Sequence, residues 1–442
     1  MFPTTPPYYY LLVTVFFAFW LVRRERLGTL ILICAANLFF YSRSGLIYLA
    51  LIPAAAGIDY LLGGAIARTE QPNLRRLLVT CSIAMNVGLI VTTKFVLSLS
   101  LSFYAFQALT YTLDIYRGDA KPAPGFGEYL ASVTFFPTIL AGPITRVSSL
   151  VPQWKWKGTV LSGEEGGRAL FLIGLGLFKK FLIADYLANN LINRVFDLPT
   201  LYSSGDVLAA VYAYAFQLYY DFSGYSDIAL GAGLLLGIRL PINFNAPYTA
   251  ANISDFWRRW HISFSNWLRD YLFFSLPGKR TKAMPYLNLV ITMAIGGLWH
   301  GISWNFLIWG LLHGIGQAVF RLWQTMKQPM WRWAACLLTF HFVLFAWIFF
   351  RAATFETAMQ ILGQIAALRP ATATFGNVSP AFLFVLLAGI AGHFIPKSWS
   401  DTSVVWFSKA PAVVQAAALA GLLLSIRLVA SSGAAPFIYS RF

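Results

Sequence analysis

The stretch MAIGGLWHGISWNFLIWGLLHGIG, residues 293–316, sets the expectations for the whole chain. It contains no Asp, Glu, Lys or Arg, yet it carries two histidines, His300 and His313, and one asparagine, Asn305. An uncharged run of this length is typical of helices that cross a bilayer, where polar side chains are expensive and usually mark function. The stretch therefore predicts a membrane fold with chemistry inside it.

The spacing of the two histidines limits how they can act together. They lie thirteen residues apart, so on one straight helix they would point about 140° away from each other and be separated by about 20 Å. They can share a site only if Gly301 breaks the helix. Otherwise the spacing favours a chemical role for one histidine and a structural role, such as donation to a backbone carbonyl, for the other.

The composition of the chain agrees with a membrane protein. Of its 442 residues 58% are apolar and 11% charged, against about 25% charged in an ordinary soluble protein. The 17% of aromatic residues also exclude disorder. The net charge of +16 is not gathered on a polar domain, so we expect no nucleic-acid partner and attribute the charge to membrane topology. Three scattered cysteines predict neither a disulfide framework nor a metal site.

Further apolar runs have nearly the length of a membrane span, which is roughly 20 residues. The segment 126–143 is interrupted by Pro137, Gly142 and Pro143, which is typical of a re-entrant or broken helix. We therefore expect an all-α integral membrane protein, a multi-pass bundle of about 10–12 spanning or re-entrant helices, with residues 1–442 forming a single membrane domain. The runs are 8–22, 27–41, 45–66, 77–93, 95–115, 169–192, 207–220, 226–240, 286–300, 303–323, 333–350, 378–395 and 411–431.

Basic residues in the first loops predict an orientation. The first connection, residues 23–26, holds three arginines, and the third, residues 68–76, holds three more, whereas the second holds only Arg43. Because Lys and Arg collect in cytoplasmic loops, we expect the first and third connections in the cytoplasm and the N-terminus outside it. The first ten residues lack the basic region of a cleaved signal peptide, so the first run should remain as a span.

A second break in the apolar pattern is NISDFWRRWHISFSNWLRDYLFFSLPGKRTK, residues 252–282. Helical periodicity predicts an amphipathic helix over 255–271 with an aromatic face and a polar face. One interpretation is an interfacial anchor in contact with membrane lipids; the other is that Arg258, Arg259 and Arg269 bind an anionic substrate from the cytoplasm. The aromatic face holds Trp257, Trp260, His261, Phe264, Trp267, Leu268 and Tyr271, and the polar face holds Asp255, Arg258, Arg259, Asn266, Arg269 and Asp270.

A third break, QLYYDFSGYSD at 217–227, gathers polar groups between two short apolar runs. Gly224 suits a turn there, and buried polar groups must satisfy one another where helices break. We therefore expect a structural polar network of Asp221, Ser223, Tyr225 and Asp227, with Asp221 as a cap or the partner of an arginine. His341 and His393 stand alone in apolar runs and are expected to be satisfied core residues.

Several familiar catalytic motifs are absent from the sequence. It contains no GxxxxGK[ST] phosphate loop, no HExxH and no GxSxG. An acid/base mechanism without a bound cofactor or metal is therefore the simplest enzymatic option.

These breaks together resemble the membrane-bound O-acyltransferase family, in particular its bacterial branch with the alginate O-acetylation and teichoic acid D-alanylation proteins. The resemblance falls within residues 100–315 and is most specific in its last three segments. The matching segments are FQALTYTLDIYRG (106–118), FFPTILAGPITR (135–146), GLFKKFLIAD (176–185), QLYYDFSGYSDIALG (217–231), DFWRRWHISFSNWLRDYLF (255–273) and GGLWHGISWNFLIWGLLHG (296–314).

The resemblance implies particular site residues. His300, in the Trp-His-Gly motif, corresponds to the essential histidine of the family, which lines a central tunnel, and His313 to the second histidine of the pattern. Trp299, Trp304 and Asn305 would shape the tunnel around them. The chain departs from the alginate-type proteins at FFSLPG, residues 273–278, so the resemblance does not establish alginate as the acceptor.

The resemblance also implies the reaction, which we expect in a bacterial cytoplasmic membrane. A short acyl group, acetyl by preference, would move from a cytoplasmic thioester, acyl-CoA or an acyl carrier, to hydroxyls of an exported or cell-envelope polysaccharide. An extracytoplasmic partner acyltransferase would take part in the transfer. A hydroxyl needs a base, and imidazole, with an ordinary pKa near 6.5, suits that task; His300 is the expected base.

Two alternatives stay open. The first is a D-alanyl-type transfer from the thioester of an acidic carrier protein, which would dock near Arg258. The second is a transporter of a polar solute, for which paired intramembrane charges or inverted repeats would be expected. The sequence shows neither.

Overall fold

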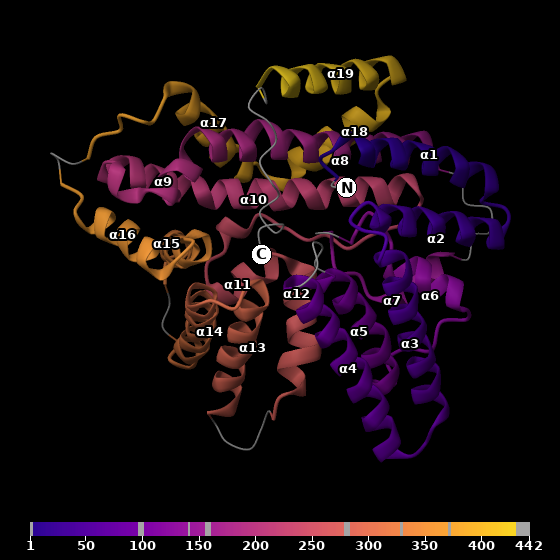
Figure 1. Ribbon diagram of the computed structural model, residues 1–442. Coiled ribbons are helices and arrows are strands. Elements are labelled where there is room, and N and C mark those ends of the chain that lie inside the picture. Colours follow the sequence, from indigo (N-terminus) through magenta and orange to yellow (C-terminus); the bar gives the residue numbers. More distant parts are fainter. Residues whose placement is uncertain are drawn as a thin grey trace. The chain divides into compact units, whose positions relative to one another are not determined.

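The computed structural model describes residues 3–95, 101–139, 142–154, 161–277, 283–327, 330–369 and 373–429. Every regular element in these ranges is a helix (Figure 1), which confirms the all-α prediction. Residues 96–100 of the predicted run 95–115, residues 430–431 of the run 411–431, and residues 140–141 and 278–282 of the other predicted segments lie outside the described residues.

Five helices of the described residues are long and apolar enough to cross a membrane, or six if a pair bent by 96° counts as one span. The chain is therefore a multi-pass membrane protein, whereas the ten to twelve spanning or partly spanning elements and the tunnel stay predictions. The five are α3 (Tyr48–Arg68), α4 (Pro72–Phe95), α14 (Trp304–Thr325), α15 (Arg332–Arg351) and α19 (Ala412–Val429); the bent pair is α17 (Pro380–His393) with α18 (Lys397–Lys409), and two shorter apolar helices are α1 (Pro6–Val22) and α2 (Arg26–Ser42).

One compact unit comprises residues 1–173, 225–241 and 407–409. In it α3, α4 and α5 (Ser102–Arg117) lie side by side, and α2 packs on α6 (Phe126–Val133). Helix α6 ends well before α7 (Val147–Leu150), as the prolines predict. Asn37 of α2 holds the chain that follows α6: its amide donates to Thr134 Oγ1 at 2.9 Å, and its oxygen accepts from the Phe136 N–H at 2.9 Å.

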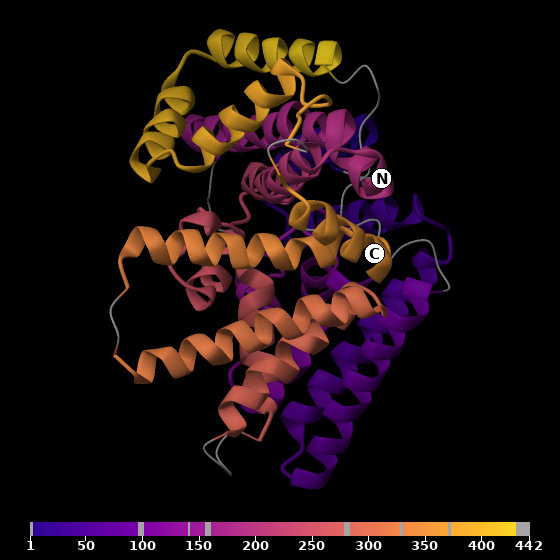
Figure 2. The ribbon, with the colours of Figure 1, turned by 90° about the vertical axis from the view of Figure 1, so that its left-hand side faces the viewer.

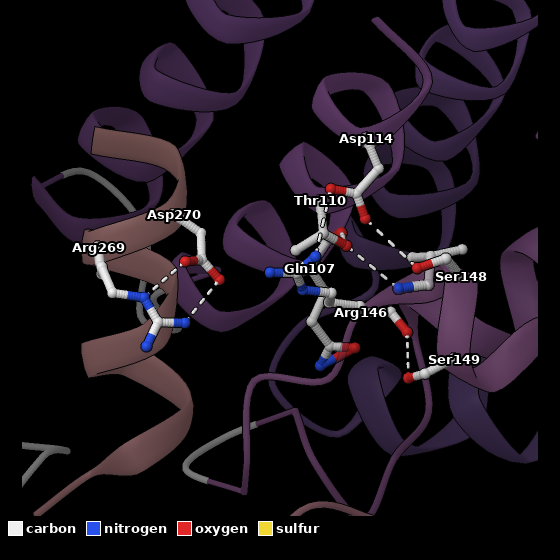
Figure 3. Close-up of polar contacts among 9 residues, drawn as sticks. Gln107, Thr110, Asp114, Arg146, Ser148, Ser149, Arg269 and Asp270 are labelled. Carbon is white, nitrogen blue, oxygen red and sulfur yellow. Dashed lines mark hydrogen bonds and ion pairs between the residues drawn. The ribbon is translucent and has the colours of Figure 1, made fainter. Parts of the chain in front are cut away.

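The same unit joins two segments of the family resemblance. Arg146 lies 3.8 Å from Asp114 of α5, and the Val147 N–H donates to Thr110 Oγ1 at 3.1 Å. Ser148 donates to the same carboxylate, as Figure 3 shows. The residues around 146 are therefore fixed to the end of α5 by polar contacts.

The other compact unit comprises residues 174–224, 242–406 and 410–442. The single membrane domain stays a prediction. Helices α8 and α10 each have residues in both units. The remaining elements are η1 (Val151–Trp154), α8 (Gly163–Leu177), the π-helical η2 (Phe178–Asp185) and η3 (Ala188–Ile192), α9 (Asn193–Asp197), η4 (Pro199–Leu201), α10 (Ser204–Leu235), η5 (Pro247–Thr249), α11 (Ile253–Arg259), α12 (Ile262–Trp267), η6 (Leu268–Leu272), η7 (Phe273–Ser275), α13 (Met284–His300) and α16 (Phe355–Ala366).

Helix α10 corrects one prediction. The runs 207–220 and 226–240 were expected to be separated by a turn at Gly224, but Gly224 lies inside one helix of 32 residues. A Cβ at Gly224 would lie 2.7 Å from the carbonyl oxygen of Gly176. The glycine therefore serves the close approach of two helices, where any larger residue would clash, and not a change of chain direction.

Helices α13 and α14 form a hairpin whose backbones touch. They lie side by side in both views (Figures 1 and 2). A Cβ at Gly297 would lie 2.3 Å from the Phe306 carbonyl oxygen, and one at Gly310 would lie 2.4 Å from the Met293 carbonyl oxygen. The glycines of the opening stretch thus set the distance between the two helices that carry the histidines.

Candidate active site

His300 is the last residue of α13, and the chain reverses direction directly after it. Gly301 follows the helix, and α14 begins at Trp304 with the Ser303 hydroxyl accepting from the Phe306 N–H. The condition set by the sequence, a break at Gly301, is therefore met. The hairpin brings both histidines into contact with one indole: the ring of Trp309 lies 5.2 Å from that of His300 and 5.0 Å from that of His313.

The imidazole of His300 is 3% exposed and lies among aromatic rings. Ring centroids of Trp299, Phe350 and Phe306 lie 4.5, 4.9 and 6.0 Å from it. Such surroundings shield a proton transfer from bulk water and strengthen the electrostatic interactions within the site.

His313 is fully buried and held by a neighbouring helix. The indole N–H of Trp257, in α11, donates to His313 Nδ1 at 3.3 Å. In a neutral imidazole one nitrogen accepts and the other carries the hydrogen, so this contact places the hydrogen of His313 on Nε2. Nε2 has no hydrogen-bond partner among the described residues.

The predicted amphipathic helix over 255–271 is not continuous, so that prediction is wrong. Helix α11 ends at Arg259, and α12 begins at Ile262 after His261, whose φ of 41° lies in the left-handed region. The aromatic side is nevertheless buried against protein: Trp260 lies 5.1 Å from Trp347 and Trp257 lies 5.2 Å from His313. These rings pack on α14 and α15, which contradicts their interpretation as an anchor in lipid.

His261 is a candidate that sequence reasoning placed on the aromatic face without giving it a role. It is buried, its Nδ1 lies 3.1 Å from Asn243 Oδ1, and its ring stacks on Phe264, which lies 4.6 Å from Trp299. Burial between two short helices lowers the pKa of His261 to about 3, so the ring is neutral at physiological pH. In the sequence, His261 could have been recognised as a candidate because it is a titratable residue on an otherwise apolar face.

Three arginines line one pocket of about 280 Å³ beside these helices. Arg258 forms no hydrogen bond or ion pair with another described residue, and Arg269 binds Asp270 through two contacts of 2.7 and 3.2 Å (Figure 3). Arg321, from α14, lies over the ring of Tyr286. The apolar wall includes Trp257, Leu268, Phe274, Leu289 and Met293.

The pocket changes the predicted set of arginines. Arg259 does not line it, because its guanidinium binds Asp255 at 3.0 Å and reaches Thr249. Arg321 joins it instead. Sequence reasoning missed Arg321 because periodicity relates only residues within one helix, whereas this arginine reaches the pocket through the α13–α14 hairpin.

The other predicted residues around the histidines have different positions. Trp299 contacts the ring of His300, whereas Trp304 is 74% exposed. Asn305 is buried and donates to the Ala352 carbonyl at 2.8 Å. The structure thus brings Trp299 to the site, uses the Asn305 amide to join α14 to the end of α15, and leaves Trp304 at the surface.

Asp221, in the third break, belongs to a buried ion cluster. Lys180 Nζ lies 2.7 Å from a carboxylate oxygen of Asp221 and 2.7 Å from one of Asp185. The partner of Asp221 is thus a lysine and not an arginine. This contact joins two segments of the family resemblance, 176–185 and 217–231. Ser223 is buried in the same unit as Asp221, whereas Tyr225 and Asp227 belong to the other compact unit.

The two remaining histidines are held by hydrogen bonds. His341 lies 2.7 Å from the Tyr212 hydroxyl and 2.8 Å from the Leu337 carbonyl, so it is satisfied as predicted, but it is exposed and not a core residue. His393 is buried and accepts from the Tyr248 N–H at 3.2 Å.

The described residues thus form an all-helical membrane protein in which Trp257 contacts the buried His313 and also lines the pocket of three arginines. Residues 119–358 match the model of MBOAT, the membrane-bound O-acyltransferase family. The chain belongs to this family and is an O-acyltransferase.

Three individual relatives show which kinds of protein the chain is similar to. The chain is 36% identical over 378 residues to a peptidoglycan O-acetyltransferase of Helicobacter pylori, covering 74% of this chain and 72% of that protein. It is 41% identical over 278 residues to a probable alginate O-acetylase of Azotobacter vinelandii, covering 61% and 54%. It is 31% identical over 283 residues to a teichoic acid D-alanyltransferase of Bacillus subtilis, covering 58% and 69%. The match thus spans only about half the length of the alginate O-acetylase.

Proposed function

We propose that the protein transfers an acetyl group from a cytoplasmic thioester toward hydroxyls of an exported or cell-envelope polysaccharide, with His300 as the base. The observation that carries this proposal is the buried His300 inside a shell of aromatic rings, at the end of a helix in a family of O-acyltransferases. Relatives named for O-acetylation of peptidoglycan and alginate favour acetyl as the group and a polysaccharide as the acceptor.

The reaction needs only a base in addition to its two substrates. His300 takes the hydroxyl proton as the hydroxyl oxygen attacks the thioester carbonyl carbon, and the protonated imidazole returns that proton to the thiolate when the carbon–sulfur bond breaks. An extracytoplasmic partner acyltransferase is the expected carrier of the acetyl group to the polymer. No bound cofactor or metal is needed for these steps.

The donor would bind in the arginine-lined pocket. Guanidinium groups form paired hydrogen bonds with phosphate and carboxylate oxygens. The phosphates of acetyl-CoA, or the acidic surface of a carrier protein, therefore complement Arg258, Arg269 and Arg321, while the apolar wall suits the neutral arm that bears the acyl group.

The function is tested by mass spectrometry of envelope polysaccharides from a deletion strain and from the same strain carrying the wild-type protein. Loss of ester-linked acetyl in the deletion strain and its return on complementation are the expected result. An ester-linked D-alanine that follows the same pattern would favour the D-alanyl alternative. Unchanged polymers, with a polar solute no longer transported, would favour a transporter.

Arg258→Lys should raise the donor KM because lysine keeps the charge but loses the paired geometry. Arg259→Lys is the matched control, since Arg259 binds Asp255 outside the pocket and its replacement should leave the donor KM unchanged. Steady-state kinetics in membranes with acetyl-CoA, at low and high salt, measure both; the difference should shrink with salt as exposed charges are screened. Equal donor KM values for the two variants and the wild type would show that Arg258 does not bind the acyl donor.

We further propose that the loops at 23–26 and 68–76 face the cytoplasm and that the N-terminus lies outside it, in the bacterial inner membrane. The motivation is the excess of arginine in these two loops. In a variant without its native cysteines, a membrane-impermeant thiol reagent added to intact cells should not label cysteines introduced at positions 24 and 72. Labelling at either position would reverse the orientation, and labelling after the cells are opened serves as the control.

A further inference from the structure

Helix α14 carries two buried N–H donors that have no acceptor among the described residues. They are Nε1 of Trp309, which is 2% exposed, and Nε2 of His313, which is 0% exposed. Leaving a buried donor unpaired is costly, so native proteins rarely do so without a reason. The two residues are four positions apart, which places them on one face of the helix, and their rings are 5.0 Å apart.

The hydrogen on His313 Nε2 is fixed by a third residue. Because Trp257 donates to Nδ1, the neutral ring of His313 can only donate through Nε2. Trp257 cannot exchange this role, since an indole nitrogen is a donor only. His313 is thus set as a donor and not as a base, which distinguishes it from the role proposed for His300.

The two donors lie next to the proposed base. The ring of Trp309 contacts both histidines, at 5.2 Å from His300 and 5.0 Å from His313. Trp257 also contacts Trp309, at 5.9 Å, and it lines the pocket that holds Arg258 and Arg269. Ring contacts therefore connect the donor pair to the proposed base on one side and, through Trp257, to a wall of the proposed donor pocket.

We propose that Trp309 Nε1–H and His313 Nε2–H bind the carbonyl oxygen of the thioester and stabilise the negative charge that it gains during acyl transfer. This inference rests on the proposed function. As the hydroxyl oxygen bonds to the carbonyl carbon, the electron pair of the C=O bond moves to the carbonyl oxygen, where the two N–H groups donate to it. The pair returns when the carbon–sulfur bond breaks, and the proton held by His300 goes to the sulfur.

Trp257 is then a positioning residue, because it acts through His313. It holds one nitrogen of the imidazole, so the other can only offer a hydrogen to the substrate. Its ring lines the arginine-lined pocket and also contacts the rings of Trp309 and His313.

The first test replaces Trp309 by phenylalanine, which keeps an aromatic ring and removes the N–H. We expect kcat for acetyl transfer from acetyl-CoA to fall about 10²–10³-fold, as for other single donors of this kind, with the donor KM and the unfolding temperature near wild type.

The control is Trp154→Phe, because the Trp154 N–H donates to Ser132 at 2.8 Å in the other compact unit. That variant should lose thermal stability and keep kcat. A Trp309→Phe protein with wild-type kcat, or one that loses only stability, would overturn the proposal.

The second test applies even if Trp309→Phe does not fold. Glutamine at position 313 can offer an N–H near the place of Nε2, whereas leucine cannot, so His313→Gln should keep more than ten times the kcat of His313→Leu.

Nitrogen NMR of histidine-labelled protein should also show the Nε2–H form of His313 in the wild type and a mixture of both forms in Trp257→Phe. Equal kcat in the two His313 variants would overturn the proposal. An inactive His300→Ala with a fully active Trp309→Phe would overturn the donor pair alone, whereas an active His300→Ala would overturn the proposed base.

Discussion

His300→Ala is expected to lower the rate of acyl transfer about 10²–10⁴-fold, which is the range that one general base contributes. The hydroxyl acceptor is a weak nucleophile at neutral pH, and the rings of Trp299, Phe306 and Phe350 that surround His300 carry no basic group. The protein should still insert into the membrane and fold, although the unfolding temperature should fall, because the buried imidazole packs against Trp309 and Phe350 and its removal leaves a cavity. The measurement is acetyl-CoA consumption per molecule of purified, folded protein, with an acceptor polysaccharide present.

Two further histidine variants make this result specific. His341→Ala removes an imidazole that is exposed and outside the aromatic cluster, so its turnover should equal that of the wild type. His313→Ala should reduce turnover less than His300→Ala, since a hydrogen-bond donor contributes less than the base. A folded His300→Ala protein with near-wild-type turnover would show that His300 is not the base of the reaction.

The membrane fold was predictable because hydrophobic burial leaves a direct record in the sequence. Most apolar runs became helices within a few residues of the predicted bounds, as for the run 8–22, which is α1 at Pro6–Val22. The break at Gly301 was recognisable as the condition for a shared histidine site. Gly224 shows where such reasoning fails, because a glycine that suits a turn and a glycine that admits a neighbouring backbone look alike until the neighbour is known.

The candidate site was only partly predictable, because it depends on contacts between distant segments. Periodicity predicted an aromatic face for residues 255–271, but neither its burial against α14 and α15 nor the left-handed backbone at His261 that divides it. Arg259 pairs with Asp255 four residues before it, a spacing that is visible in the sequence. The position of Arg321 in the pocket depends on the helix hairpin, which leaves no local pattern. The Trp257 contact with His313 spans 56 residues and required the folded chain.

Lys180→Met is expected to destabilise the protein by about 3–5 kcal/mol, the usual effect of leaving a buried charge without its partner. Lys180 lies between two carboxylates, Asp185 and Asp221, each 2.7 Å away, and all three side chains are at most 5% exposed. Removing the ammonium leaves two negative groups in a region of low dielectric, where their repulsion is weakly screened. Unfolding of the purified protein in mixed micelles with increasing SDS measures the change.

Asp221→Asn tests whether the loss of stability in Lys180→Met is caused by charge. In that variant Lys180 keeps Asp185, so one positive group faces one negative group, and the loss of stability should be clearly smaller than in Lys180→Met. Combining Lys180→Met with Asp221→Asn should recover part of the loss, because only one of the two carboxylates then remains and their mutual repulsion is removed. If the double variant is no more stable than Lys180→Met, repulsion between the carboxylates is not the cause, and the packing of the lysine stem in η2 would explain the loss instead.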